Sequence, residues 1–212
     1  MFDHVETWIF DLDNTLYHPS ARLFDQINAK MTGFIMRELG VGRAEADRLR
    51  QGYWQRHGTT LRGLIEEHRV DAVRFLDEVH EIDLAALAPD ADLAEALRRL
   101  PGRKIVHTNG ARSHAARVLA ARGLTGHFDA VYAIEDKALV PKPQRDAYDR
   151  IVRLDGFDPA RAAMIEDDAR NLEVPKALGM ATVWVSHRNG AKAPGWVDRR
   201  ISRLTTFLRE FE

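Results

Sequence analysis

The order of apolar patterns along the chain constrains its fold more than any single residue does. A β-rich stretch at Val5–Phe10 is followed by a helical pattern over Ala21–Leu97, and only after that block do short strand-like and helical stretches alternate. Such alternation favours a parallel sheet with helices on its faces. Because a crossover between parallel strands typically needs only one helix, the long helical block indicates an insertion after the first strand.

The expected elements follow from the spacing of apolar residues and from Gly and Pro breaks. Apolar residues three or four apart at Leu23, Ile27, Met31, Phe34 and Ile35 predict one helical face. Further helices are expected at Ala44–His57, Thr60–His68, Ala72–His80, Leu93–Leu100, His114–Arg122, Gln144–Leu154, Asn171–Leu178 and, as a tail, Val197–Phe211. Further strands are expected at Lys104–His107, Phe128–Ile134, Ala162–Ile165 and Ala181–Val185. The predicted fold is α/β, with a parallel sheet, helices on its faces and an all-helical insertion.

Composition narrows the classes of function. The chain has 212 residues, 45% hydrophobic and 30% charged, which is ordinary for a soluble globular protein. It contains no cysteine, which excludes disulfides, cysteine zinc sites and a cysteine nucleophile. The net charge of −1 gives no electrostatic reason to expect nucleic acid or an anionic membrane as a partner. No signal peptide and no apolar stretch of ~18 residues is seen, so a cytoplasmic location is expected.

Polar clusters directly follow the expected strands. Asp11, Asp13 and Thr15 follow the first strand, Thr108-Asn109 follows the next, and Glu166-Asp167-Asp168 follows a third. Ligands of open α/β sheets bind at the carboxyl ends of the strands, so these clusters are expected to meet at one site.

Asp11 and Asp13 are two residues apart and can face one ligand on an extended chain. One carboxylate can attack phosphorus to form an aspartyl phosphate, and the other can protonate the leaving oxygen and then activate water. The alternative is a pair of turn aspartates that cap a loop.

The remaining clusters suit a bound phosphate and a cation. Thr108 and Asn109 precede a helix and can form a phosphate seat, or simply cap that helix. Lys142 lies between two prolines, which would hold it in a set direction. A buried ammonium beside carboxylates and phosphate would offset their charge, and a solvated loop lysine is the alternative. The Glu166-Asp167-Asp168 triplet suits Mg²⁺, or else an exposed acidic turn.

Taken in order, these motifs resemble the haloacid dehalogenase superfamily. The ordered set is Asp11-Leu12-Asp13-Asn14-Thr15, Thr108-Asn109, Lys142-Pro143 and Glu166-Asp167-Asp168. The resemblance implies a Rossmann-like core at residues 1–18 and 89–212 and a helical cap at residues 19–88. It also implies a Mg²⁺-dependent phosphatase, because the dehalogenases lack the second aspartate of the first motif.

The resemblance assigns a role to each matching residue. Asp11 would be the nucleophile and a Mg²⁺ ligand. Asp13 would be the general acid and base and would lend its backbone carbonyl to the metal. Thr108 and the Asn109 backbone would hold phosphoryl oxygens, Lys142 would steady Asp11, and Asp167 would be a second metal ligand.

One departure leaves part of the metal site open. Many family members carry another aspartate four or five residues after the first acid of the last motif, where this chain has Asn171 and Leu172. The additional ligand, direct or through water, could be Glu166, Asp168 or Asn171.

A narrower resemblance concerns the substrate. The first motif with Leu16-Tyr17, the stretch Tyr53–Leu64 and His107–Gly110 look like the pyrimidine 5′-nucleotidase group, which implies UMP and CMP as substrates. Tyr53, Trp54 and His57 offer stacking faces and Arg62 a planar fork for a nucleotide, although such residues are usually cap core or solvated.

Other functions stay open at this point. A phosphatase for phosphoglycolate or a sugar phosphate would carry the same motifs, as would an enzyme that transfers the phosphoryl group to an acceptor other than water. A non-catalytic nucleotide- or phosphoprotein-binding module on the same fold would predict a broken motif, and all four motifs carry competent residues.

Overall fold

The computed structural model describes residues 2–188, 190 and 192–211, and a parallel sheet lies at its centre. Within these residues the sheet has six strands in the order β3-β2-β1-β4-β5-β6, and every neighbouring pair is parallel. The strands are β1 (Thr7–Phe10), β2 (Arg103–His107), β3 (Ala130–Tyr132), β4 (Ala162–Glu166), β5 (Ala181–Val185) and β6 (Arg199–Ile201). The predicted α/β fold with a parallel sheet is confirmed.

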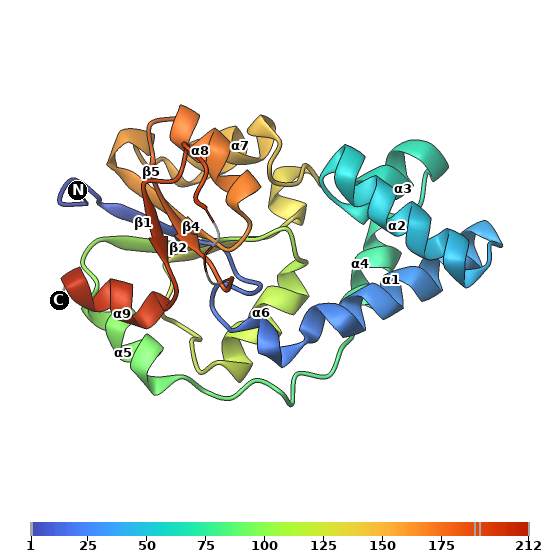
Figure 1. Cartoon of the computed structure of the whole chain (residues 1–212), viewed down its shortest axis with the longest axis horizontal. Helices are drawn as coiled ribbons and strands as arrows, with labels where there is room; N and C mark the ends of the chain where they lie inside the picture. The colour runs from blue at the N-terminus through green and yellow to red at the C-terminus, as the bar shows by residue number, and fades with distance from the viewer. Residues whose placement is uncertain (1, 189, 191, 212) are drawn as a thin grey trace.

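Helices cover both faces of this sheet (Figure 1). Side chains alternate along a strand, so Trp8 and Phe10 point to one face and Ile9 to the other. The first face packs against α5 (Ala91–Arg99), α6 (Arg112–Ala121) and α9 (Leu204–Leu208). The second face packs against α7 (Arg145–Asp155), with α8 (Glu173–Ala177) on the same side. The central strand β1 is fully buried between these layers.

The chain between β1 and α5 forms a separate group of helices. They are α1 (Leu23–Leu39), α2 (Arg43–His57), α3 (Thr60–His68) and α4 (Ala72–His80), and they lie beyond the edge of the sheet in Figure 1. They enclose an apolar cluster of their own that includes Phe34, Tyr53, Leu64 and Phe75. We refer to this group as the cap; the exact boundaries at residues 18–19 and 88–89 stay a prediction.

The C-terminal segment differs from its sequence-based expectation. A tail helix over Val197–Phe211 was expected, but Arg199–Ile201 forms the edge strand β6, and α9 begins only at Leu204. The apolar spacing of such a short segment fits a strand as well as a helix, and the pairing of Arg199–Ile201 with β5 makes it a strand.

Pro175, which lies inside a helix expected from the sequence, is tolerated because it lies in the first turn of that helix. Pro175 is the third residue of α8, which begins at Glu173 after a short 3₁₀ turn at Ala169–Leu172. Backbone N–H groups of the first helical turn have no partner within the helix, so a proline there removes no hydrogen bond.

Among the described residues, no helix has the length and apolar character to cross a bilayer.

Candidate active site

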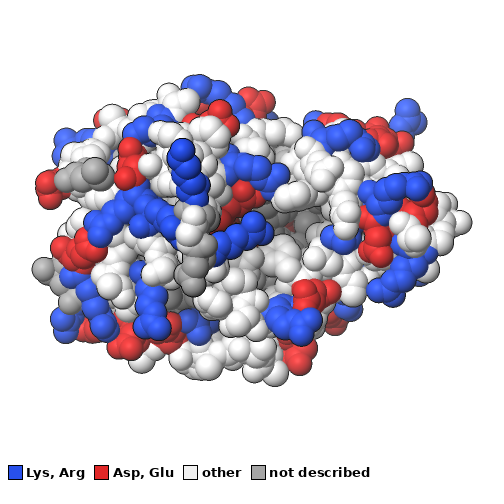
Figure 2. Space-filling model, viewed as in Figure 1, with Lys and Arg blue, Asp and Glu red and all other residues white. Residues whose placement is uncertain are grey.

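The polar clusters predicted from the sequence meet at the carboxyl edge of the sheet. Asp11 directly follows β1, Thr108 follows β2, and Glu166 ends β4. Because β1 lies between β2 and β4, these side chains converge on one cavity of about 700 Å³. Figure 2 shows the hollow between the sheet-containing half and the cap, with acidic side chains on its sheet side.

Lys142 links the carboxylates at the bottom of this cavity. Its side chain is 1% exposed, and its ammonium donates hydrogen bonds to Asp11 Oδ1 at 2.7 Å, Glu166 Oε2 at 2.6 Å and the His107 carbonyl at 2.8 Å. Burial alone would lower the pKa of Lys142, but the Asp11 and Glu166 carboxylates raise that pKa above the ordinary lysine value. Lys142 is therefore a permanent positive charge beside Asp11.

The carboxylates of Asp11, Glu166 and Asp167 form a compact acidic cluster. One oxygen of each lies within 4.8 Å of the others. Burial, together with Glu166, raises the pKa of Asp11 to about 7, although Lys142 opposes the shift. Burial, with Glu166 and Asp11, raises the pKa of Asp167 to about 10. Carboxylates crowded in this way stay ionised together only beside a cation, and their oxygens suit a hard divalent ion such as Mg²⁺.

Glu166 is already engaged by protein donors on both oxygens. Its Oε2 accepts from Lys142, and its Oε1 accepts from the Asp168 N–H at 3.2 Å. Asp11 and Asp167 are therefore the residues best suited to hold a metal ion, with Glu166 as the partner of Lys142. Asp168 and Asn171 both line the cavity, and Arg170 donates to the Asp168 carboxylate from Nε at 3.0 Å.

Asp13 also lines the cavity, and its Oδ1 accepts hydrogen bonds from other side chains. Tyr17 donates its hydroxyl to Oδ1 at 2.8 Å, and His114 Nε2 lies 2.8 Å from the same oxygen. Burial alone would raise the pKa of Asp13, but His114 and Tyr17 together lower that pKa below the ordinary value.

Thr108 and Asn109 border the cavity where β2 leads into α6. Thr108 is 1% exposed, and its Oγ1 accepts from the Gly110 N–H at 2.9 Å. The Asn109 side chain is occupied by the neighbouring loop: its Oδ1 accepts from the Lys142 N–H at 2.8 Å, and its Nδ2 donates to the Lys142 carbonyl at 3.0 Å. Asn109 thus joins the second and third motifs through its side chain.

The match to known proteins agrees with this arrangement. The profile of a hydrolase family, described as haloacid dehalogenase-like hydrolase, matches residues 5–179. The chain belongs to this family. The matched segment contains every polar cluster at the sheet edge and the whole of the cap.

Relatives of this haloacid dehalogenase-like hydrolase include curated proteins and solved structures. Phosphate metabolism protein 8 of Saccharomyces cerevisiae is 28% identical over 84% of this chain, which spans only 60% of that relative. A phosphoglycolate phosphatase of Mesorhizobium japonicum is 28% identical over 96% of this chain and 86% of its own length. The crystal structure of a HAD phosphatase from Thermococcus onnurineus is 21% identical, covers 97% of both chains and has a TM-score of 0.65. The last similarity shows the shared fold.

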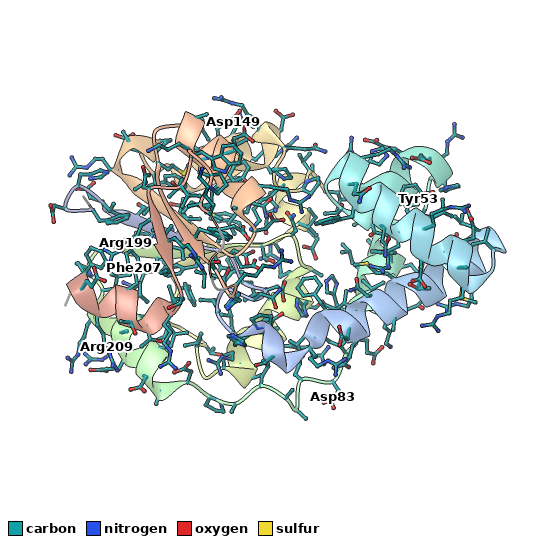
Figure 3. The ribbon with its side chains drawn as sticks, in the orientation of Figure 1. Tyr53, Asp83, Asp149, Arg199, Phe207 and Arg209 are labelled. Atoms are coloured by element: carbon teal, nitrogen blue, oxygen red, sulfur yellow. The ribbon has the colours of Figure 1, made fainter. Side chains whose placement is uncertain are left out.

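Of the cap residues of the hydrolase that were expected to contact substrate, Trp54 lines the main cavity, whereas Tyr53, His57 and Arg62 lie outside it. Tyr53 is fully buried in the cap cluster, where its hydroxyl lies 2.6 Å from His68 Nε2, and Figure 3 shows it among the cap helices, away from the sheet. His57 lies 2.9 Å from Glu66 and borders a smaller hollow beside the main cavity. Arg62 pairs with Glu66 as well. None of the three is among the described residues that line the main cavity.

The cap instead lines the main cavity with a different face of α2. Arg50, Gln51, Trp54 and Gln55 lie three or four residues apart on this face. The Nη1 of Arg50 donates to Asn28 Oδ1 of α1 at 2.7 Å, and Arg50 Nε is buried without a hydrogen-bond partner among the described residues. Phe24, Ile27, Met31, Phe75 and Leu76 add apolar walls.

Sequence reasoning missed the residues that form hydrogen bonds to the predicted site residues and hold them in place. Tyr17 and His114 hold Asp13, and Lys137, fully buried, donates to the Thr108 carbonyl at 2.7 Å. Burial and the nearby Lys142 hold the pKa of Lys137 well below the ordinary lysine value. A signal existed for His114, since it lies on the same helical face as buried Ala115 and Val118.

Proposed function

We propose that this chain is a Mg²⁺-dependent phosphomonoesterase that works through an aspartyl phosphate on Asp11. The observation that carries the proposal is the contact of the Lys142 ammonium with Asp11 Oδ1 at 2.7 Å, beside the acidic cluster. It leaves Asp11 Oδ2 as the attacking oxygen, next to a fixed positive charge that offsets the charge of a phosphoryl group.

The proposed reaction has two steps. In the first step Asp11 Oδ2 forms a bond to phosphorus while the bond to the leaving oxygen breaks, and Asp13 gives that oxygen a proton. In the second step a water oxygen bonds to phosphorus, Asp13 takes the proton of the water, and the bond to Asp11 breaks to release inorganic phosphate. Thr108 and the Asn109 backbone hold phosphoryl oxygens, and Lys142 offsets their charge. A divalent cation held by Asp11, Asp167 and the Asp13 carbonyl would add Lewis-acid stabilisation.

The presence of Asp13 favours phosphoryl transfer over dehalogenation, because Asp13 supplies a second carboxyl group that can act as an acid. A dehalogenase needs no acid to protonate a departing halide, whereas a phosphatase must protonate an alkoxide. Asp13 borders the same cavity as Asp11 and Thr108, which suits that task.

For the substrate, we propose a pyrimidine nucleoside monophosphate such as UMP or CMP. The cavity of about 700 Å³ lies within the range of sites for ligands larger than a two-carbon acid. The exposed Trp54 offers a face for a base, and Arg50 with Asn28 offers polar groups for its edge. The cytoplasmic location expected from the sequence stays a part of this proposal.

A phosphatase for phosphoglycolate is the second candidate. It is favoured by the Mesorhizobium japonicum relative, whose similarity extends over 96% of this chain. Arg50 would then bind a carboxylate in place of a base.

The test is phosphate release from UMP, CMP, phosphoglycolate and a sugar phosphate, with Mg²⁺ and with EDTA. We expect Mg²⁺-dependent release with the highest kcat/KM for UMP or CMP, and loss of turnover in a folded Asp11→Asn variant. A higher kcat/KM for phosphoglycolate would replace the nucleotide proposal by the second candidate. Full activity of Asp11→Asn would refute the covalent mechanism.

A further inference from the structure

Within the described part of the chain, the side-chain donors to the Asp13 carboxylate are on its Oδ1 side. Tyr17 donates its hydroxyl to Oδ1, and His114 Nε2 contacts the same Oδ1, each at 2.8 Å. Oδ1 carries no proton, whether Asp13 is ionised or protonated on Oδ2, so it can only accept, and the geometry assigns the proton of His114 to Nε2. These bonds fix the rotation of the Asp13 carboxylate.

The donors to Asp13 are themselves held rigidly. Tyr17 is 4% exposed and His114 is fully buried. The His114 ring packs on His80 of the cap, with ring centres 4.7 Å apart. One turn further along α6, Arg117 donates to the His80 carbonyl at 3.0 Å and to the Ile82 carbonyl at 2.6 Å, which ties α6 to the end of the cap.

The other oxygen of Asp13 lies toward the expected phosphate seat. A β-carbon added at Gly110 would lie 3.4 Å from Asp13 Oδ2 and 3.2 Å from Thr108 Oγ1, so both oxygens border the same small space. Oδ1 therefore faces protein donors, while Oδ2 lies on the side of Thr108.

We propose that Tyr17 and His114 are positioning residues for proton transfer, which hold Asp13 through Oδ1 so that Oδ2 alone exchanges the proton. This inference rests on the proposed phosphatase function. Oδ2 gives its proton to the leaving oxygen as the phosphorus–oxygen ester bond breaks. It then takes a proton from the water that displaces Asp11 from phosphorus.

The dependence of rate on the leaving group separates this role from a purely structural one. A p-nitrophenolate departs without a proton, whereas the alkoxide of a nucleoside or sugar phosphate needs one. The ratio kcat/KM includes every step up to departure of the leaving group, so it reports on the acid. The assay compares p-nitrophenyl phosphate with the alkyl phosphate that the unsubstituted enzyme hydrolyses best.

The variants are His114→Phe and Tyr17→Phe, each of which removes a donor and keeps a ring. We expect kcat/KM for the alkyl phosphate to fall about tenfold or more, and kcat/KM for p-nitrophenyl phosphate to stay within about threefold. His114→Gln keeps an N–H donor and should restore most of the alkyl rate. His127→Phe is the matched control, because His127 lies in the loop after α6, at the opposite end of the strands.

Equal losses for both esters, or no loss for either, would overturn the positioning role. If His114→Phe does not fold, the same ratio measured in Tyr17→Phe decides the question, since that change removes only a hydroxyl group. Absence of phosphate release from both esters by the unsubstituted enzyme would instead refute the proposed function, and the positioning role with it.

Discussion

Replacing Lys142 by methionine removes a buried positive charge that contacts both Asp11 and Glu166. The side chain keeps a similar length, but its hydrogen bonds to Asp11, Glu166 and the His107 carbonyl are lost. The two carboxylates remain buried, with side chains 8% and 2% exposed. The change therefore leaves buried negative charge without its partner.

The size of the effect follows from that burial. Removing one partner of a buried ion pair costs about 3–5 kcal/mol of unfolding free energy. In a chain of this size, 1 kcal/mol corresponds to about 2–4 °C, so the melting temperature should fall by about 6–20 °C in EDTA. Loss of a preorganised donor at the reacting group should also lower kcat by about 10²–10³-fold.

Thermal unfolding in EDTA and in Mg²⁺, together with kcat, measures both effects. We expect Mg²⁺ to recover part of the lost stability, because a cation can relieve the carboxylates, but not the lost rate. Lys176→Met is the matched control, since Lys176 pairs with Asp198 at the surface and its loss should shift the melting temperature by less than about 4 °C. A melting temperature of Lys142→Met in EDTA within that same margin would refute the reasoning.

Further changes test the metal site, the cap and the buried histidine. Asp167→Asn should weaken Mg²⁺ binding at least about tenfold in calorimetric titration, and unchanged affinity would remove Asp167 from the ligand set. Gly63→Ala should lower the free energy of unfolding in denaturant by about 1–3 kcal/mol, because its β-carbon would lie 2.4 Å from the Tyr53 ring. Gly33→Ala in α1 is the control: its β-carbon would make only an ordinary contact, at 3.5 Å, and the change should raise that free energy by about 0.5–1 kcal/mol. Equal effects of the two changes would contradict the packing argument. Burial and His114 lower the pKa of His80 to about 4. Between pH 6.5 and about 4 the unfolded chain therefore binds one more proton than the folded chain, and stability is lost as the pH falls through this range. The His80→Leu variant should lose less stability over this range, which thermal unfolding at pH 7 and pH 4.5 would show.

The sheet and its strand-end clusters could be predicted because their signals are local. An apolar run followed by polar residues marks a strand end, and parallel pairing brings such ends together whatever their separation in sequence. Asp11, Thr108 and Glu166 meet in the cavity for that reason. The β6 strand was missed because only its pairing with β5 distinguishes it from a helix.

The cap residues named from the sequence lie on two faces of the cap helices, and of them only Trp54 is among the described residues that line the main cavity. Tyr53 shares its face of α2 with Ala46 and Leu49, whereas Arg50 and Trp54 lie on the face that lines the cavity. Helical spacing separates the two faces in the sequence, but the apolar face alone does not say which neighbour covers it. Tyr53 is buried because Gly63 of α3 leaves room directly against its ring, and this pairing exists only in three dimensions.

The contact between Trp54 and Arg170 makes the fluorescence of Trp54 sensitive to separation of the cap from the sheet. The Arg170 guanidinium lies 3.9 Å from the centre of the indole ring, and its other side is held by Asp168, beside the acidic cluster. The contact joins α2 of the cap to the loop after β4, so any separation of cap and sheet must break it. Since 45% of the Trp54 surface is exposed, loss of the cation from its ring would change the indole emission. Opening for product release could therefore be timed by stopped-flow fluorescence without an attached dye.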